Sequence, residues 1–305
     1  MPLPARLRRT LLALLLVVLV AGCAPEDGDA GVGEVAVSGP FGSVPTIEVD
    51  TPLPMQDART EVLVEGDGRV LAGEEPVLFA LTAFDGQDGE VVAERGVGEA
   101  RTLMLAPADV GEDLYPVLVG TPEGSRLLVR QPVTEDGADR MLLLVIDVLH
   151  TRAHGTEQEV PDHLPQVSTG PEGEPSITLP EEPPPDDLVI TRVIRGEGPR
   201  VRPGQHTTVQ YTGVEWETGE QYDSTWAAGK VPQTVRVDET FPGLRAGLVG
   251  QPVGSRVLLV IPPDQAVGTE TLVLVVDVLA TSGGEEDLAV PPGPDSAQDG
   301  QTSGS

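Results

Sequence analysis

Short runs of β-branched and aliphatic residues, separated by Gly, Pro and acidic residues, make up the hydrophobic pattern of this chain. The clearest runs in its second half are residues 189–194, 207–213, 234–237, 256–261 and 271–279. Runs of this length and composition, bounded by turn residues, predict β-strands. Residues 242–250 could form a helix, and their three glycines predict a short one that depends on tertiary packing. The pattern predicts an α+β fold in which one short helix lies against an antiparallel sheet.

The first 23 residues have the pattern of an export signal. A basic start precedes an apolar run over residues 11–20, which is short for a membrane span and typical of a signal peptide at residues 1–22. The run ends in Leu-Val-Ala-Gly before Cys23, the arrangement of a bacterial lipobox. We therefore expect Cys23 to carry lipid and to anchor the chain to the extracytoplasmic face of the cell membrane. The alternative is an ordinary signal peptide followed by an incidental cysteine.

Two parts of the chain match each other at one constant offset in residue number. Residues 120–126 (GTPEGSR) match residues 250–256 (GQPVGSR), and residues 142–151 (LLLVIDVLHT) match residues 272–281 (LVLVVDVLAT). A period this long indicates two copies of a domain and not a solenoid unit. The expected copies are residues 46–153 and residues 186–282.

The segments outside these copies are rich in Gly, Pro and acidic residues. Residues 23–45 are Gly-rich and acidic, which predicts a flexible tether. Residues 154–185 contain many prolines and glutamates, which predicts a semi-extended linker of polyproline type. Residues 283–305 have the composition of a disordered tail.

The charge and the cysteine content exclude several classes of function. The chain has 19 Lys and Arg against 49 Asp and Glu, a formal net charge of −30, so it would repel nucleic acid. Its single cysteine excludes an internal disulfide and a multi-cysteine metal site. His150 and His154 are four residues apart, but no helical pattern surrounds them, so we interpret them as an incidental pair in a linker. Residues 85–90 resemble a calcium loop in composition only and are expected to form a hairpin turn.

The second copy resembles the FKBP-type peptidyl-prolyl cis-trans isomerases over nearly its whole length. The resemblance rests on the order and spacing of five motifs: VQYTG at 209–213, GEQYDSTW at 219–226, PGLRAGLVG at 242–250, VGSRVLLVIPP at 253–263 and TLVLVVDVL at 271–279. It implies that each copy is an antiparallel sheet curled around one short helix. It also implies rotation about X–Pro bonds as the activity, a reaction that needs no cofactor, metal or nucleophile.

The resemblance also implies a set of site residues, in a region where five of the nine aromatic residues lie between Tyr211 and Phe241. The catalytic set is Tyr211, Tyr222 and Asp223. The substrate-binding set is Trp226, Phe241, Leu244, Val267 and Leu274, with the backbone N–H of Phe241 holding a substrate carbonyl. Without the resemblance, Tyr211 and Tyr222 would be ordinary strand residues and Asp223 a solvated turn residue.

Several positions depart from the family pattern. Leu244 stands where the family has the tryptophan of the pocket floor, and Val267 where it has a loop tyrosine. Ala228 stands where the arginine that pairs with Asp223 is expected, and a carboxylate without its partner would remain more solvated. These departures predict shallower prolyl binding and weaker turnover.

The first copy has lost the same site. Leu81 replaces Tyr211, and Val92 and Ala93 replace Tyr222 and Asp223. We therefore expect a non-catalytic spacer or docking domain there. For the whole chain we expect a prolyl isomerase that acts on X–Pro segments of exported proteins at the membrane surface. The alternative is a non-catalytic, peptide-binding or chaperone-like scaffold built from two isomerase-like domains.

Overall fold

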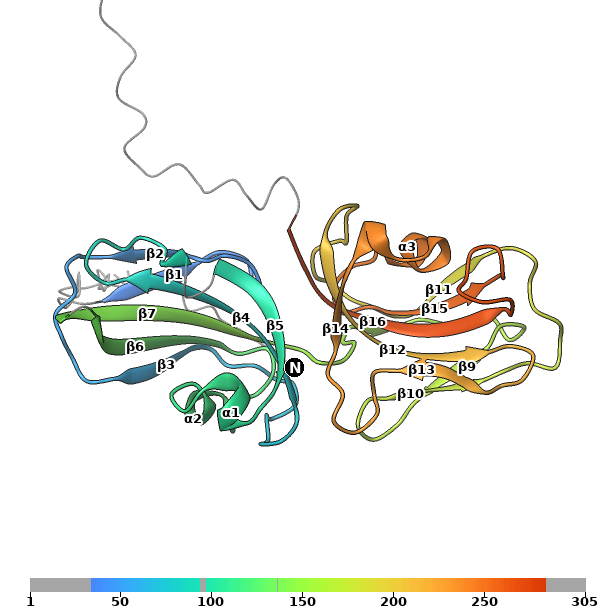
Figure 1. Cartoon of the computed structure of the whole chain (residues 1–305), viewed down its shortest axis with the longest axis horizontal. Helices are drawn as coiled ribbons and strands as arrows, with labels where there is room; N and C mark the ends of the chain where they lie inside the picture. Colours follow the sequence, from blue (N-terminus) through green and yellow to red (C-terminus); the bar gives the residue numbers. More distant parts are fainter. Residues whose placement is uncertain (1–33, 94–96, 136, 284–305) are drawn as a thin grey trace, which may run out of the picture.

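Two large β-sheets, each with helices on one face, and two separate two-stranded hairpins make up the described part of the computed structural model (Figure 1). The structure describes residues 34–93, 97–135 and 137–283. The predicted signal peptide at 1–22, the lipidation site Cys23 and the predicted tail from residue 284 onward lie outside these ranges.

We call residues 35–151 the N-terminal unit. Its elements are β1 (Val35–Ser38), β2 (Thr46–Val49), β3 (Arg59–Val64), β4 (Pro76–Asp85), β5 (Val97–Met104), α1 (Pro107–Val110), α2 (Tyr115–Leu118), β6 (Arg126–Glu135) and β7 (Ala138–Leu149). The turn that follows β4 is closed by a hydrogen bond of 2.7 Å from the Gly89 N–H to the Asp85 carbonyl, which confirms the predicted hairpin turn.

We call residues 156–282 the C-terminal unit. Its elements are β8 (Thr156–Glu157), β9 (Gln166–Thr169), β10 (Pro175–Thr178), β11 (Val189–Arg195), β12 (His206–Glu215), β13 (Gln221–Ser224), β14 (Gln233–Arg236), the 3-10 helix η2 (Val237–Glu239), α3 (Pro242–Leu248), β15 (Arg256–Ile261) and β16 (Leu272–Ser282). The five predicted strands are present as β11, β12, β14, β15 and β16, and the predicted helix is present as α3.

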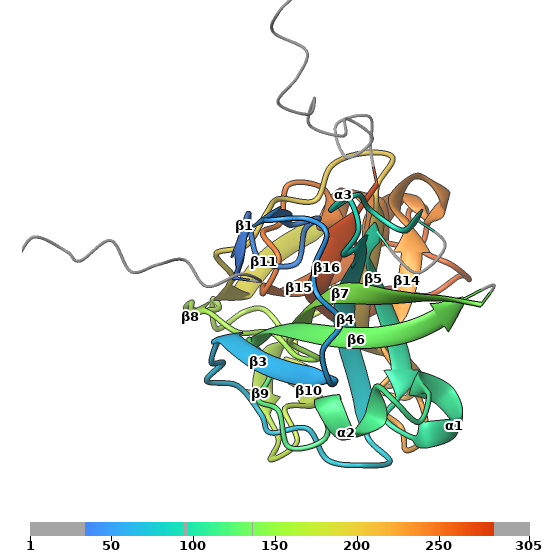
Figure 2. The same cartoon turned by 90° about the vertical axis from the view of Figure 1, so that its left-hand side faces the viewer.

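The two sheets have the same strand order. The N-terminal sheet runs β3-β6-β7-β4-β5, and Figure 2 shows β3, β6 and β7 side by side. The C-terminal sheet runs β11-β15-β16-β12-β13, with β8 beside β11 and β14 beside β12. The strands in these sheets pair antiparallel, so the predicted α+β class is confirmed.

Both faces of the C-terminal sheet are buried, which explains its continuous apolar runs. Successive residues of a strand point to opposite faces. On one face, here called the helix face, Val257 and Leu259 of β15 pack in the apolar cluster that also contains residues of α3. On the other, here called the hairpin face, Leu258 and Val260 pack against residues of β9, β10 and Trp216. Every residue of β15 is therefore buried.

The hairpins that cover these faces correct two predictions. Strands β1 and β2 form an antiparallel hairpin, although residues 35–38 were predicted as part of the flexible tether. Strands β9 and β10 form another, within the predicted linker at 154–185. Val35 packs against the N-terminal sheet, and Val167 and Ile177 pack against the C-terminal sheet. The prediction was wrong because the composition concealed short apolar alternations, and the second sheet face that they cover is visible only in the structure.

A buried ion pair fastens the β9–β10 hairpin to its sheet. The guanidinium of Arg256 donates to both carboxylate oxygens of Asp277, over 2.7 and 2.8 Å. It also donates to the Thr169 hydroxyl over 2.8 Å and to the Gly173 carbonyl over 2.6 Å, both in the hairpin. The side chains of Arg256 and Asp277 are only 1% and 0% exposed, so their charges depend on each other for compensation.

The N-terminal unit has the same arrangement, at the matching positions of the repeat. Arg126 donates to both carboxylate oxygens of Asp147, over 2.6 and 2.8 Å. Its remaining donors reach the carbonyls of Gly39 and Pro40, next to β1, over 2.9 Å each. Because a guanidinium has five N–H donors in a planar fork, one arginine can hold the carboxylate and the hairpin together.

Helix α3 lies against β15 because two of its glycines face the sheet. A Cβ atom on Gly243 would lie 2.3 Å from Cγ2 of Ile261, and one on Gly247 would lie 2.5 Å from Cδ1 of Leu259. The N-terminal unit differs from the prediction of one helix, because α1 ends at Gly111, whose φ is 91°, and α2 forms a separate single turn. Within the described ranges, no helix has the length and apolar character needed to cross a bilayer.

Candidate functional site

Tyr211 and Asp223 meet on neighbouring strands of the C-terminal sheet. Tyr211 lies on β12, and Asp223 lies on β13, opposite Gly213 of β12. The Tyr211 hydroxyl donates a hydrogen bond of 2.5 Å to Oδ2 of Asp223. The Tyr211 N–H donates to the hydroxyl of buried Thr225 over 2.9 Å, which holds this part of β12 against the loop after β13. The structure thus brings two of the three predicted catalytic residues into direct contact.

Asp223 has a cationic partner that the sequence analysis missed. Nζ of Lys230 lies 3.2 Å from Oδ1 of Asp223 and donates to the Ser224 carbonyl over 2.5 Å. The prediction of an unpaired carboxylate was therefore wrong, because a lysine two residues beyond Ala228 occupies the cationic position. The available signal was that Lys230 is the only lysine in the chain and lies seven residues after Asp223.

The environment of this pair sets its protonation. The hydrogen bond from Tyr211, with further help from the Ser224 N–H and Lys230, holds the pKa of Asp223 below its usual value against the opposing effect of burial. Burial and the hydrogen bond to Asp223 raise the pKa of the Tyr211 hydroxyl well above its usual value. At neutral pH the carboxylate is therefore ionised and the tyrosine keeps its proton.

Four of the predicted site residues contribute to one apolar cluster on the helix face. Leu274 is a buried member of the cluster, and Tyr211, Phe241 and Leu244 pack against it while remaining partly exposed. Gly213 makes room for this packing, since a Cβ atom there would lie 2.4 Å from Cδ2 of Leu274. The arrangement provides an apolar wall beside the Tyr211–Asp223 pair.

The remaining predicted residues are not members of this apolar cluster. Tyr222 and Val267 are 45% and 47% exposed. Trp226 follows β13, and its indole nitrogen is shielded from solvent without a hydrogen-bond partner among the described residues. Trp216 lies on the hairpin face, so the aromatic residues of this region do not all gather at one site.

The Phe241 N–H is available for a hydrogen bond. Phe241 is the residue that precedes α3, and its carbonyl accepts the hydrogen bond from the Arg245 N–H. Within the described ranges the structure has no acceptor for the Phe241 N–H itself. This leaves one backbone donor at the edge of the apolar wall.

The matching position in the N-terminal unit is filled by apolar side chains. Leu81 of β4 pairs with Ile146 of β7, as Tyr211 pairs with Val276 in the C-terminal sheet. Leu81 is only 7% exposed, and it packs in the same cluster as Val92. An apolar core therefore occupies the place where the C-terminal unit carries the tyrosine and aspartate.

The other candidate sites do not include the predicted site residues. A cavity of about 480 Å³ lies beside β8 and β11, where Arg195 and Arg200 line it. Within the described residues, no group of three or more His, Cys, Asp or Glu side chains is placed to hold a metal ion. The Tyr211–Asp223 pair and its apolar wall are thus the arrangement that matches the sequence prediction.

Comparison with known proteins identifies the family. The C-terminal unit matches the family model described as FKBP-type peptidyl-prolyl cis-trans isomerase over residues 198–278. A Corynebacterium glutamicum protein named "Probable FK506-binding protein" is 41% identical over 115 residues, which cover 35% of this chain and 97% of that protein. This chain belongs to the FKBP-type peptidyl-prolyl cis-trans isomerase family. It is therefore an enzyme of the peptidyl-prolyl cis-trans isomerase class.

Two further proteins are similar over a comparable part of the chain. The FK506-binding protein of Streptomyces anulatus is 34% identical over 118 residues, covering 35% of this chain and 95% of that protein. The crystal structure of FkpA from Escherichia coli is 27% identical, covers 38% of this chain and 51% of that chain, and has a TM-score of 0.30.

Proposed function

We propose that this FKBP-type isomerase acts through its C-terminal unit on X–Pro bonds of exported proteins, at a membrane surface to which lipid on Cys23 attaches it. The observation that carries the proposal is the hydrogen bond of 2.5 Å between Tyr211 and Asp223 beside an apolar wall. The N-terminal unit, with Leu81 and Val92 in the matching positions, is in this proposal a non-catalytic copy of the same domain.

The chemistry needs few functional groups. Rotation about an X–Pro bond faces a barrier of about 18–20 kcal/mol because the C–N bond has partial double-bond character. A site lowers this barrier if it binds the twisted amide more tightly than either planar form. In our proposal the prolyl ring packs on Tyr211, Phe241 and Leu274, and the Phe241 N–H donates to a substrate carbonyl. The protein needs neither a nucleophile nor a cofactor for this step.

Asp223 and Lys230 have a supporting role in this mechanism. Asp223 accepts the hydroxyl hydrogen of Tyr211, so the phenol is satisfied and its ring is held as part of the apolar wall. Lys230 lies beside the carboxylate and compensates its charge at the rim. A cation at this place is expected to keep Asp223 ionised as the apolar substrate approaches.

The side chains that line the proposed site are expected to give only modest isomerase activity. Leu244 offers less flat apolar area than an aromatic residue would, and Val267 is 47% exposed. Aromatic side chains bury more surface than aliphatic ones. We therefore propose weaker prolyl binding and slower turnover than the family pattern implies.

A protease-coupled isomerisation assay of the full chain on an X–Pro peptide tests the catalytic proposal. We expect Tyr222→Ala to lower kcat/KM, because Tyr222 lies at the exposed rim of the proposed site. Val92→Ala changes the matching position of the N-terminal unit and is expected to leave kcat/KM unchanged. A wild-type rate equal to the uncatalysed rate, or equal losses in both variants, would contradict the proposed site.

The same peptide distinguishes the second candidate function, a non-catalytic scaffold. The apolar replacement of the site in the N-terminal unit is the observation that favours it. A scaffold would bind the peptide, as measured by calorimetry, without accelerating its isomerisation. Acceleration that disappears in Tyr222→Ala would instead support the enzyme.

Attachment to the membrane has a separate test. We expect the full chain to sediment with the membrane fraction of the cells that make it, and Cys23→Ser to move it into the soluble fraction. A Cys23→Ser variant that remains in the membrane fraction would contradict lipid anchoring at this residue. Isomerase activity would be unaffected by either result, because Cys23 lies outside both units.

A further inference from the structure

The two units are joined by a short segment that is hydrogen-bonded at both of its ends. At its start, the Thr151 hydroxyl donates to Oε1 of Glu123 over 2.6 Å, which ties it to the N-terminal unit. At its end, the N–H of Ala153 donates to Oδ2 of Asp277 over 2.9 Å, and the N–H of His154 donates to the Gly254 carbonyl over 2.9 Å. Residues 150–154, which include the last two residues of the N-terminal unit, therefore form a short joint between the two sheets.

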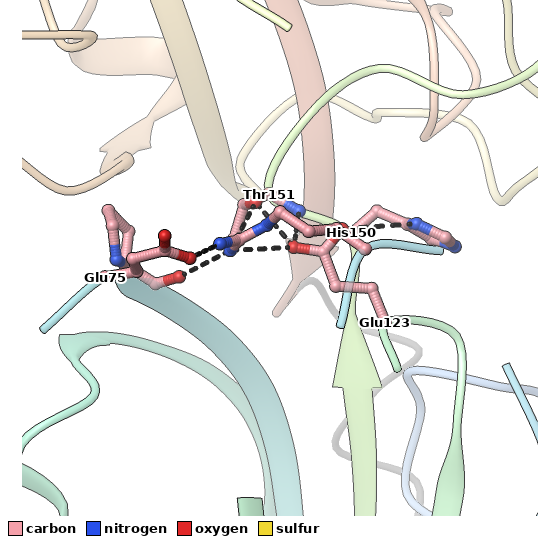
Figure 3. Close-up of polar contacts among 6 residues, drawn as sticks. Glu75, Glu123, His150 and Thr151 are labelled. Carbon is pink, nitrogen blue, oxygen red and sulfur yellow. Dashed lines mark hydrogen bonds and ion pairs between the residues drawn. The ribbon is translucent and has the colours of Figure 1, made fainter. Parts of the chain in front are cut away.

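A cluster of ionisable groups, centred on the buried Glu123, surrounds the start of this joint (Figure 3). Glu123 is only 1% exposed, and its second oxygen lies 3.7 Å from Nδ1 of His150. Arg69 lies 3.3 Å from Glu123 and also pairs with Glu75. Glu123 thus collects the Thr151 hydroxyl, the Arg69 guanidinium and the His150 ring, all within the N-terminal unit.

Two imidazole rings span the joint. His150 and His154 are stacked, with ring centroids 3.8 Å apart and an interplanar angle of 29°. Glycines lie next to both rings: a Cβ atom on Gly68 would lie 2.9 Å from Cε1 of His150, and one on Gly254 would lie 3.1 Å from Cε1 of His154. The interpretation of the two histidines as an incidental pair was therefore wrong, because the fold packs them closely between the units.

The repeat provides an internal comparison for this cluster. At the constant offset of the two copies, Val253 matches Glu123 and Ala280 matches His150. Thr281 matches Thr151, yet its hydroxyl donates to Gln205 and not to a carboxylate. The ionisable groups thus occur in the copy whose last strand leads into the joint, and their counterparts in the other copy are apolar or neutral.

The apolar part of the contact between the units is small. Its buried residues are Leu78, Ala80 and Leu149 from the N-terminal unit against Leu279 and Ala280 from the C-terminal unit, and Ala100 packs against them. Contacts of this kind between domains of one chain resemble transient interfaces. A change in charge at the joint can therefore shift the balance between contact and separation.

The ionisable groups that face His154 determine whether a fall in pH strengthens or weakens the docking of the two units. They are His150, Glu123 and Asp67 from the N-terminal unit, with Arg69 behind Glu123. The Arg152 carbonyl contacts His154 within the joint, and Asp277 of the C-terminal unit is engaged by the Ala153 N–H.

Burial, and then the neighbouring His150, lower the pKa of the His154 ring below its ordinary value, against smaller opposing effects from Glu123 and Asp67. Burial alone would raise the pKa of Glu123, but the His150 and Thr151 hydrogen bonds and the Arg69 charge hold it below its ordinary value. In the docked state His154 therefore holds a proton less strongly than a free histidine does. The contribution of His154 to docking is complete at neutral pH and falls as the pH drops below the ordinary histidine pKa of about 6.5.

We propose that the His150–His154 stack is a pH-sensitive joint, which keeps the two units docked at neutral pH and releases them from each other in mildly acidic surroundings. Protonation places positive charge on a ring that is stacked on a second imidazole, and separation of the units relieves the contact between the two rings. This proposal does not depend on catalysis, because the cluster lies outside the Tyr211–Asp223 site.

Hydrogen exchange of the full chain at about pH 7.5 and about pH 5.5, corrected for the intrinsic pH dependence of exchange, tests the proposal. In the wild type we expect the amides of Ala153 and His154, which are hydrogen-bonded to the C-terminal unit, to lose protection at the lower pH, while β12 and β15 keep theirs. His154→Phe retains an aromatic ring without a titrating nitrogen and is expected to remain protected at both pH values. His163→Phe, a change at an exposed histidine away from the joint, is the matched control and should behave as the wild type does.

Two results would overturn the proposal. One is a wild type whose junction amides are equally protected at both pH values. The other is a His154→Phe variant that loses protection at low pH as the wild type does. If the phenylalanine prevents docking even at neutral pH, His154→Gln provides the non-titrating comparison, and the same two outcomes decide the question.

Discussion

Replacing Arg256 by methionine tests the role of the buried ion pair in the C-terminal unit. The change removes the partner of Asp277, whose side chain is 0% exposed, and leaves that carboxylate charged in the interior. It also removes the hydrogen bonds that hold Thr169 and Gly173 of the β9–β10 hairpin. Methionine fills much of the vacated volume, so the loss comes mainly from the uncompensated charge and the detached hairpin.

The expected loss is about 3–5 kcal/mol in the free energy of unfolding, the usual cost of removing one partner of a buried pair. With a denaturant slope of about 2 kcal/mol per molar urea, the midpoint should fall by about 2 M. Both tryptophans of the chain, Trp216 and Trp226, lie in the C-terminal unit. Their fluorescence during urea unfolding therefore reports this unit selectively.

Two variants make the result specific. Arg126→Met removes the matching arginine of the N-terminal unit and should leave the tryptophan transition close to that of the wild type. The double variant Arg256→Met with Asp277→Leu removes both charges and should recover most of the lost stability. A loss below about 1 kcal/mol in Arg256→Met, or a double variant less stable than the single one, would refute the reasoning about the buried charge.

Three further outcomes follow from the same geometry. Asp223→Asn removes the charge that accepts the Tyr211 hydroxyl and pairs with Lys230, so we expect lower kcat/KM with little change in the unfolding midpoint, since Asp223 is partly exposed. The folded state lowers the pKa of Asp223, so the ionised carboxylate should stabilise the protein at pH values above its ordinary pKa of about 3.9 and should lose this effect in stronger acid. Unfolding of the wild type and of Asp223→Asn, measured as a function of pH, tests this expectation. Gly243→Ala places a Cβ atom 2.3 Å from Ile261 and should cost about 1–3 kcal/mol in urea unfolding; an unchanged midpoint would contradict the close approach of α3 to β15.

The strands could be predicted because their residue pattern is local. The runs that became β11, β15 and β16 are bounded by turn residues, and the match between the two halves at a constant offset indicated that the pattern occurs twice. The hairpins β1–β2 and β9–β10 could not be predicted in this way. Each is a pair of four-residue strands in a Gly-rich or Pro-rich segment, and its stability comes from a sheet face that distant residues build.

The site was predicted in part because its motifs, like the strands, are local features of the sequence. The spacing of Tyr211 and Asp223 in family motifs was sufficient to suggest that they act together. The partner of Asp223 was missed because Lys230 reaches the carboxylate through the path of a loop, and a sequence position does not specify that path. Trp216 is one of the five aromatic residues between Tyr211 and Phe241, but strand alternation and the turn after β12 place it on the opposite face.

By itself, the sequence determined the strands β11, β12, β14, β15 and β16, the short helix α3 and the family, because each depends on residue type and short-range spacing. The tertiary structure decided which segments cover the sheets, where Lys230 binds and how His150 and His154 meet. These features depend on contacts between residues that are far apart in the chain or in loops without a repeating pattern. Burial makes such contacts important for stability, since a charge removed from water depends on the partners that the fold supplies.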